Sequence, residues 1–272
     1  MTLESRLQKF SGLGPGFDFL RVALALAILF WHCFGISYGF AWTRTALPSL
    51  PFPPILAAFL PMFFALSGFL VMGSAIRTAN LKVFITFRVL RILPALATEI
   101  SLSALILGPI MTVLPLADYF SDPKFWSYFG SLVGRVQYVL PGLFVHNPMP
   151  YVVNGALWTV GPEILCYIIM AWLMLFGWYK SRPVMTLFTL AFLAMCIFSD
   201  RWATGTINEI LPTKALIFSF LCGNLLYLYR ARIPYSISLA ILLFLASVGL
   251  NYAAQSSEFL RFTIYPAAAG FA

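Results

Sequence analysis

Charged side chains are scarce in this 272-residue chain: 10% of its residues are Asp, Glu, Lys or Arg, whereas 61% are hydrophobic. A mean hydropathy of +0.90 is too apolar for a water-soluble domain. The short segments of alternating polarity that build outer-membrane barrels are also missing. Several apolar runs instead reach the roughly 20 residues that a helix needs to cross a bilayer. We therefore predict an all-α, polytopic transmembrane helix bundle.

Acidic residues are the scarcer charge type, with nine Asp and Glu against 17 Lys and Arg and a formal net charge of +8. The basic residues gather in short segments between apolar runs and not in one block. This distribution follows the positive-inside rule and argues against nucleic acid as a partner. It also predicts a cytoplasmic N-terminus, because Arg6 and Lys9 precede the first apolar run.

Cysteine is rare, and all four cysteines fall inside predicted spans without a CxxC pair: Cys33, Cys166, Cys196 and Cys222. This pattern predicts neither a disulfide framework nor a metal site. No signal-peptide cleavage site follows the first apolar run, so we expect that run to remain as a membrane anchor. The chain also lacks the internal repeats that many transporters carry.

The apolar runs predict about seven to nine complete spans plus one truncated span. Seven runs are clear, namely Phe17–Tyr38, Ile55–Ile76, Ile92–Leu114, Leu157–Phe176, Val184–Phe198, Ile210–Tyr229 and Pro234–Tyr252. The stretch Leu116–Ala156 must add zero or two crossings, as a folded loop, a helical hairpin or a re-entrant piece. A last run begins at Phe259 and stops at Ala272. We therefore expect residues 1–272 to form a single membrane-embedded domain that is truncated at its C-terminus.

Two ionisable residues lie inside the first predicted helix, Arg21 and His32. Eleven residues on an α-helix turn through about 1100° and rise about 16 Å, so both side chains leave within about 20° of the same face. Arg21 alone would be read as a snorkelling anchor, and His32 alone as a packing residue. Because ionisable groups inside a membrane are costly, the pair on one face predicts a functional groove.

A second basic pair lies in the acid-free stretch Arg77–Arg91, which is the strongest cytoplasmic signal in the sequence. Arg88 and Arg91 are three residues apart, on one side of a helix. Arginine forks match phosphate geometry, so this pair can hold a polyanionic ligand that enters from the cytoplasm. The competing interpretation is topological, because every membrane protein needs basic residues on that side.

Carboxylates inside apolar segments form the last group of candidates. Glu163 follows Pro162 at a predicted helix start, where a carboxylate either caps the helix or does chemistry. Glu99 is expected to neutralise an arginine. Two other features receive structural interpretations: Ser67-Gly68 is expected to allow close helix packing, and His146 is expected to be a loop residue.

Four motifs in this order resemble the membrane acyltransferase-3 family. They are Arg21-x10-His32, FFALSGFL at 63–70, Arg88-x-x-Arg91 followed by Ile92-Leu93-Pro94, and NGALWTVGPEILCY at 154–167. The resemblance rests on motifs over residues 17–167 and on hydropathy beyond them. It implies a full-length fold of about ten spans in the bacterial inner membrane.

The resemblance also implies a function. Members of this family take an acyl group from cytoplasmic acyl-coenzyme A and pass it to a hydroxyl of a surface polysaccharide or related glycan. By motif, Arg21, Arg88 and Arg91 are then expected to bind acyl-CoA, and His32 and Glu163 to be catalytic. The acyl group is expected to be acetyl. Acyl-CoA is a substrate here, and no permanently bound cofactor is implied.

Two other functions fit parts of the sequence. In a transporter or flippase without catalysis, Arg21, His32 and Glu99 would line a permeation path. An inactive, truncated acyltransferase would follow from the end of the chain inside an apolar run. The acceptor, a glycan or a lipid-linked sugar, is not encoded by any motif in the loops.

Overall fold

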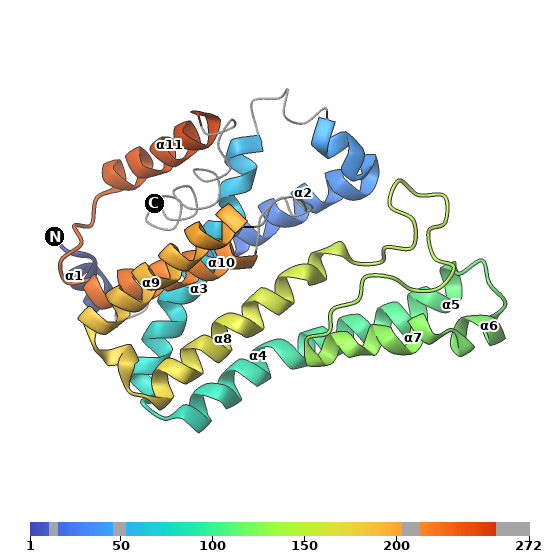
Figure 1. Ribbon diagram of the computed structural model, residues 1–272, viewed down its shortest axis with the longest axis horizontal. Helices are drawn as coiled ribbons and strands as arrows, with labels where there is room; N and C mark the ends of the chain where they lie inside the picture. The colour runs from blue at the N-terminus through green and yellow to red at the C-terminus, as the bar shows by residue number, and fades with distance from the viewer. Residues whose placement is uncertain (11–15, 46–52, 203–212, 254–272) are drawn as a thin grey trace. The chain divides into compact units, whose positions relative to one another are not determined.

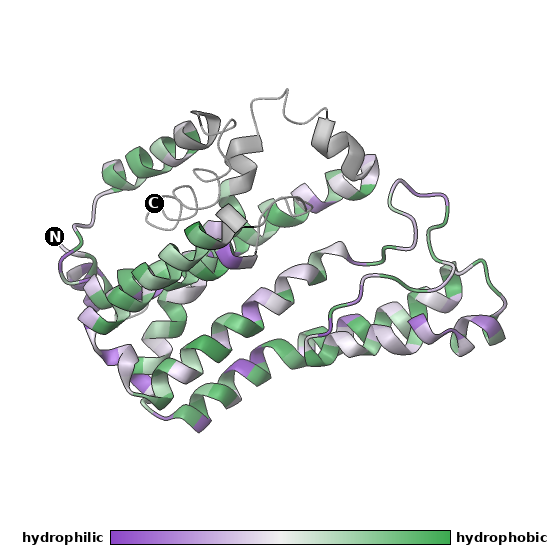
Figure 2. Cartoon of the chain, viewed as in Figure 1, coloured by the Kyte–Doolittle hydropathy of each residue, from purple (hydrophilic) through white to green (hydrophobic). Residues whose placement is uncertain are grey.

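The computed structural model describes residues 1–10, 16–45, 53–202 and 213–253 (Figure 1). The described chain is mostly helical, and its only bridges of β type are two isolated pairs, Thr2 with Pro234 and Val139 with Val152. This confirms the predicted all-α class. Figure 2 shows many hydrophobic residues in each long helix, with hydrophilic residues between them.

Four helical segments are long and apolar enough to cross a membrane: Phe17–Gly39, Ala58–Thr78, Leu81–Met111 and Gly155–Leu175. Three shorter apolar helices follow, at Arg182–Phe198, Thr213–Tyr229 and Ile237–Gly249. The protein is therefore a multi-pass membrane protein. All seven clear runs of the sequence correspond to these helices, while the total of seven to nine complete spans stays a prediction. The run that begins at Phe259 lies outside the described residues.

The chain forms two compact units. One comprises Met1–Ile28, Pro51–Leu81 and Ile168–Ala272. Its helices are α1 (Leu3–Gln8), the start of α2 (Phe17–Thr45), α3 (Pro53–Thr78), the end of α8 (Val160–Leu175), η5 (Trp178–Lys180), α9 (Arg182–Trp202), α10 (Thr213–Tyr229) and α11 (Ile237–Ala253).

The centre of this unit is the contact between α3 and α10. Most residues of α10 are buried. A Cβ added to Gly68 would overlap the carbonyl of Phe220, and one added to Gly223 would overlap the carbonyl of Ala65. Each glycine thus lets one helix backbone rest on the other, which is the usual role of small residues between membrane helices. The predicted packing role of Gly68 is confirmed.

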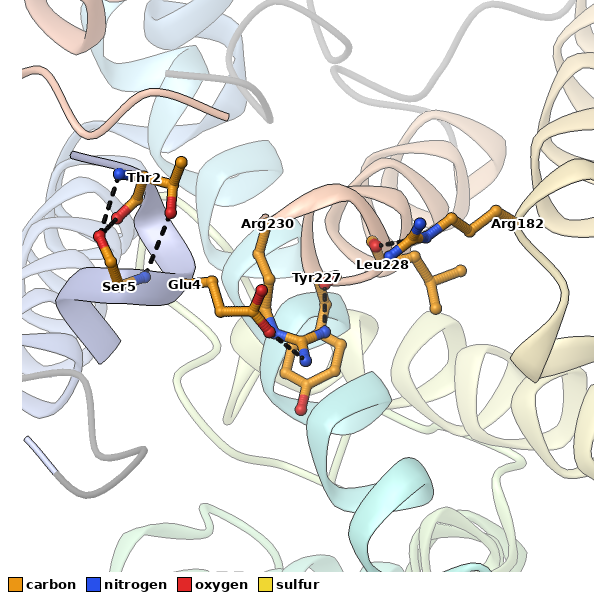
Figure 3. Close-up of polar contacts among 7 residues, drawn as sticks. All are labelled: Thr2, Glu4, Ser5, Arg182, Tyr227, Leu228 and Arg230. Atoms are coloured by element: carbon orange, nitrogen blue, oxygen red, sulfur yellow. Dashed lines mark hydrogen bonds and ion pairs between the residues drawn. The ribbon is translucent and has the colours of Figure 1, made fainter. Parts of the chain in front are cut away.

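Polar contacts fix α1 to the end of α10 (Figure 3). Thr2 and Ser5 form a capping box at the start of α1. Glu4 Oε1 then pairs with Arg230 Nη2 at 3.0 Å, and Arg182 Nε donates to the carbonyl of Leu228 at 3.0 Å. These contacts join three segments that carry basic residues, which the positive-inside rule predicts to lie on the cytoplasmic side.

The other unit comprises Leu29–Leu50 and Lys82–Tyr167. A long helix passes through it as α4 (Leu81–Leu102), the π-helical turn η2 (Ser103–Leu107) and α5 (Gly108–Met111). The rest of α2 and the first half of α8 also belong to it. The remaining elements are short, namely α6 (Leu116–Ser121), α7 (Pro123–Tyr128), η3 (Phe129–Val133) and η4 (Gly155–Thr159).

The helix of the third apolar run extends further toward the N-terminus than the run itself. The helix begins at Leu81 and not at Ile92, so Arg88 and Arg91 lie on its second and third turns. Pro94 lies in the helix interior. The reason is that an arginine stem can lie along apolar neighbours while its charged end remains polar, so basic residues do not by themselves end an apolar helix.

Residues 112–154, called the lobe below, pack against the far end of this long helix. Their buried cluster joins α4 to the lobe through Leu96, Ile100, Ala104, Tyr119, Phe125, Tyr128, Leu140, Leu143 and Leu157. The helices of the lobe have at most six residues, which is far too short to cross a bilayer. The structure therefore favours zero crossings in this stretch, with the chain folded as a compact loop.

Candidate functional site

Arg88 on α4 and Tyr167 on α8 bring polar side chains of two apolar helices together. The guanidinium carbon of Arg88 lies 5.6 Å from the ring centre of Tyr167 and 5.5 Å from that of Phe84. Such distances allow cation–π attraction, which is strengthened where water is excluded. Phe84 is fully buried and Tyr167 nearly so. The two rings therefore hold the Arg88 fork at a fixed place.

Tyr167 also joins this arginine to a carboxylate. Its hydroxyl donates to Glu163 Oε1 at 2.5 Å. The two residues are four apart on α8, so they lie one above the other on the same face. Arg91 is exposed on α4, three residues after Arg88 and therefore on the same side of that helix. Arg88, Arg91, Tyr167 and Glu163 thus form one polar cluster, called the Arg–Tyr–Glu cluster below.

Glu99 is the centre of a second polar group, which lies further along α4 than Arg91. Its Oε1 accepts from Asn154 Nδ2 at 2.9 Å, from Ser103 Oγ at 3.1 Å and from the Tyr128 hydroxyl at 3.4 Å. Its Oε2 is buried and has no hydrogen-bond partner in the described chain. All three of these partners are neutral donors, and the neutralisation of an arginine by Glu99 stays a prediction.

Asn154 connects Glu99 to the start of α8. While its amide nitrogen donates to Glu99, its Oδ1 accepts from the backbone N–H of Ala156 at 3.0 Å and caps η4. The η4 turn leads directly into α8, which carries Glu163 and Tyr167. The Glu99 carboxyl therefore helps to fix the start of the helix that bears the Arg–Tyr–Glu cluster.

Two buried tyrosines complete this region, and both remain neutral donors near neutral pH. The Tyr119 hydroxyl donates to the carbonyl of Ala104, inside the π-helical turn, at 2.8 Å. Burial raises the pKa of Tyr119 to about 12. Burial also raises the pKa of Tyr128, and the neighbouring Glu99 charge raises it further.

The other predicted site residues lie on α2. Arg21 belongs to the first unit, where its Nη1 lies 3.6 Å from Asp18 Oδ1, one turn earlier. His32 is half-buried and falls in the second unit. Both residues lie on α2, and their common face stays a prediction. The second histidine, His146, is exposed in a turn of the lobe, as expected for a loop residue.

Tyr167 was not predicted as a site residue, although it is the contact between Arg88 and Glu163. The signal that could have identified it is the i, i+4 spacing from Glu163 inside the motif at 154–167, since a tyrosine one turn after a carboxylate can hydrogen-bond to it. Ser103 has the same spacing from Glu99, whereas Asn154 carried no such signal. Their common partner Glu99 is 55 residues from Asn154 in the sequence.

Comparison with known proteins identifies relatives. An O-acetyl transferase of Shigella phage Sf6 is 30% identical over 155 residues, which cover 56% of this chain and 44% of that protein. Nodulation protein 10 of Rhizobium leguminosarum bv. viciae is 28% identical over 180 residues, 60% of this chain and 45% of its own length. The chain thus matches less than half the length of either relative. No solved structure matches.

The sequence also matches the acyltransferase-3 family, described as an acyltransferase domain, over residues 15–272. This range contains all four motifs that carried the resemblance and every residue of the Arg–Tyr–Glu cluster. Because the match extends over far more than half of the chain, the protein belongs to the acyltransferase-3 family.

Proposed function

We propose that this protein is an integral-membrane O-acyltransferase. It transfers an acyl group, acetyl in the first instance, from cytoplasmic acyl-CoA to a hydroxyl of an extracytoplasmic carbohydrate. The observation that carries the proposal is the Arg–Tyr–Glu cluster, in which a phosphate-compatible arginine fork and a fixed carboxylate occur together in a chain of this family. The name of the phage relative, an O-acetyl transferase, supports the reaction class.

The proposed setting is the inner membrane of a bacterium, with a cytoplasmic N-terminus and one catalytic domain over residues 1–272. Positive charge in the predicted cytoplasmic segments supports this orientation. Contacts among Glu4, Arg182 and the end of α10 support it too, because segments on opposite sides of a membrane could not touch.

Donor binding is assigned to Arg88 and Arg91, with Arg21 as a third cation. Coenzyme A carries several phosphate oxygens, and arginine binds such groups with two parallel hydrogen bonds. Arg91 is exposed and can meet a phosphate directly. Arg88 is braced by two rings, so less conformational entropy is lost when it binds.

His32 is the proposed general base. It takes the proton from the acceptor hydroxyl as that oxygen attacks the thioester carbonyl carbon. The carbon–sulfur bond then breaks, and the CoA thiolate receives the proton from His32. This role contributes typically about 10²–10⁴-fold in rate. An acyl-histidine intermediate is the alternative, which we favour less because it requires a second transfer step.

Glu163 is proposed as a positioning residue for His32 or for the acceptor sugar. Its Oε1 is held by Tyr167, which leaves Oε2 as the acceptor for a histidine N–H or a sugar hydroxyl. The bond from Tyr167 keeps the carboxylate in one rotamer, a requirement for such a role.

The test is O-acetyl analysis of surface glycans by mass spectrometry, in cells with and without the full-length protein. The chain supplies a matched control, because it contains two histidines only. His32→Ala should abolish transfer, and His146→Ala should leave it unchanged. Wild-type transfer by His32→Ala would refute the mechanism. Uptake of a labelled solute without acetyl-CoA consumption would instead establish the transporter function.

A further inference from the structure

The lobe contains a cavity at the far end of the long helix. It has a volume of about 280 Å³ and is bounded by residues from three segments: Val113 and Leu114, Asp122 and Lys124, and 139–151. This volume is just below the usual range of small-molecule sites, about 300–1,000 Å³. The cavity therefore fits one ring of a ligand and not an extended chain.

Tyr151 lies at the wall of this cavity in a backbone conformation that few side chains adopt. Its φ is +65°, and its side chain is 43% exposed. The conformation is held from both sides, because Tyr151 N donates to Leu143 O at 3.1 Å and Leu140 N donates to Tyr151 O at 3.4 Å. Backbone strain of this kind gathers at binding sites, where the surrounding fold maintains it.

The same loop holds two further residues with positive φ, Gly142 at +68° and Phe144 at +50°. Gly142 lines the cavity, and a Cβ there would collide with Thr112 Oγ1 and Leu114 Cγ. The loop is also hydrogen-bonded to the end of the long helix, through Val113 N to Gly142 O at 3.0 Å. The cavity wall is therefore built before any ligand arrives.

Two charged residues give the cavity both a hydrogen-bond acceptor and a hydrogen-bond donor. Asp122 Oδ1 accepts from the backbone N–H of Lys124 at 2.7 Å, which fixes the carboxylate while Oδ2 keeps its acceptor capacity. Lys124 also lines the cavity, and its ammonium can supply donors. These groups match a neutral sugar ring. The tyrosine ring can pack on the apolar face of the sugar, the carboxylate can accept hydrogen bonds from its hydroxyls, and the ammonium can donate to its hydroxyl oxygens.

We propose that this cavity is a binding subsite for one neutral pyranose ring of the acceptor glycan, with the ring on Tyr151 and its hydroxyls on Asp122 and Lys124. The inference rests on the proposed function, because it names the acceptor side of that reaction. The long helix ends at Met111, two residues before the cavity residue Val113 and 20 residues beyond Arg91, which is about 30 Å along the helix axis. The subsite therefore holds a ring at a distance from the Arg–Tyr–Glu cluster, and the acceptor is an oligosaccharide or a longer chain.

The experiment measures sugar binding by saturation-transfer NMR on the full chain in lipid nanodiscs. The probes are the methyl glycosides of glucose, galactose, mannose and rhamnose. Tyr151→Gly removes the ring but tolerates the positive φ, so it should not unfold the loop. Tyr138→Ala is the control, since Tyr138 is an exposed tyrosine of the neighbouring segment that does not line the cavity.

At least one glycoside should bind the wild type, with a dissociation constant that rises at least tenfold in Tyr151→Gly and in Asp122→Asn but not in Tyr138→Ala. Equal thermal unfolding midpoints for these proteins establish that the loss is local. If no glycoside binds the wild type, or if Tyr151→Gly binds as tightly, the subsite is refuted.

A second measurement separates this inference from the proposed function. Acetyl-CoA consumption is followed in the same nanodiscs with a cell-surface glycan extract present. Consumption together with unchanged sugar binding in Tyr151→Gly refutes the subsite and leaves the acyltransferase function standing. Sugar binding that depends on Tyr151, without any consumption by the wild type, refutes the acyltransferase function and supports the subsite.

Discussion

The hydroxyl of Tyr167 lies 2.5 Å from Oε1 of Glu163, one helical turn earlier on α8. The same ring faces the Arg88 guanidinium at 5.6 Å. One side chain thus contacts a carboxylate through its hydroxyl and a cation through its ring. The two contacts can be removed separately, which makes Tyr167 the most informative residue of the cluster.

Tyr167→Phe should lower the turnover number and leave the KM for acetyl-CoA nearly unchanged, because the ring beside Arg88 remains. A hydrogen bond to a charged group is worth about 1.5–3 kcal/mol, so a loss of about 10–100-fold in kcat is expected if Glu163 requires it. Tyr167→Ala should raise the KM as well. Steady-state kinetics of both variants checks this prediction, and a normal kcat for Tyr167→Phe would contradict it.

Arg88→Lys should weaken acetyl-CoA binding more than Arg91→Lys does. Arg88 lies against two rings with its planar fork, and lysine reproduces neither the fork nor the stacking. Arg91 is exposed, so a lysine there keeps most of its attraction for phosphate. Arg135→Lys in the lobe serves as the control. Isothermal titration with coenzyme A measures the three affinities, and equal losses at positions 88 and 91 would disprove the distinction.

Glu99→Gln should be much less destabilising than Glu99→Ala. The glutamine carbonyl can accept the bonds now made to Oε1 by Asn154, Ser103 and Tyr128. Alanine would leave these donors without an acceptor, at about 1–3 kcal/mol for a buried polar group. Thermal unfolding in nanodiscs compares the two variants. Equal losses would show that the carboxylate charge, and not the acceptor, is what the fold requires.

The high pKa of Tyr119 predicts a specific loss of stability in alkali. Its pKa is raised to about 12 in the fold, whereas an unfolded tyrosine titrates near about 10. Between these values the unfolded chain binds fewer protons than the folded one, so the free energy of unfolding falls as the pH rises. Below about pH 10 this group adds no pH dependence. Unfolding midpoints at pH 8 to 12 should fall less steeply in Tyr119→Phe.

Gly223→Ala should strongly destabilise the contact between α3 and α10, because the new Cβ would overlap the Ala65 carbonyl. Overpacking of this kind costs typically about 1–3 kcal/mol. Gly249→Ala on α11 is the matched control, since a Cβ there meets nothing within 4 Å. Thermal unfolding of both variants checks this prediction. Similar unfolding midpoints would contradict it, because the two helices would then accommodate the added methyl group without loss of stability.

The sequence predicted the helical class, the apolar helices and the packing role of Gly68 because these follow from hydrophobicity and residue size, which are local properties. It did not predict the contact of Arg88 with Tyr167, since that contact depends on a helix far along the chain. The partners of Glu99 were missed for the same reason: two of the three come from residues 29 and 55 positions away. The roles of His32 and Arg21 remain predictions.

The π-helical turn at Ser103–Leu107 adds one residue to the winding of the long helix. One extra residue turns everything beyond it by about 100° around the helix axis. The Tyr119 hydroxyl donates a hydrogen bond to the carbonyl of Ala104 in this turn and stabilises it. The turn therefore determines the direction in which the lobe projects from the helix axis. Deleting Leu105 alone would restore the α-helical winding. The sugar subsite would then lie on another side of the helix, although no residue of the subsite had changed.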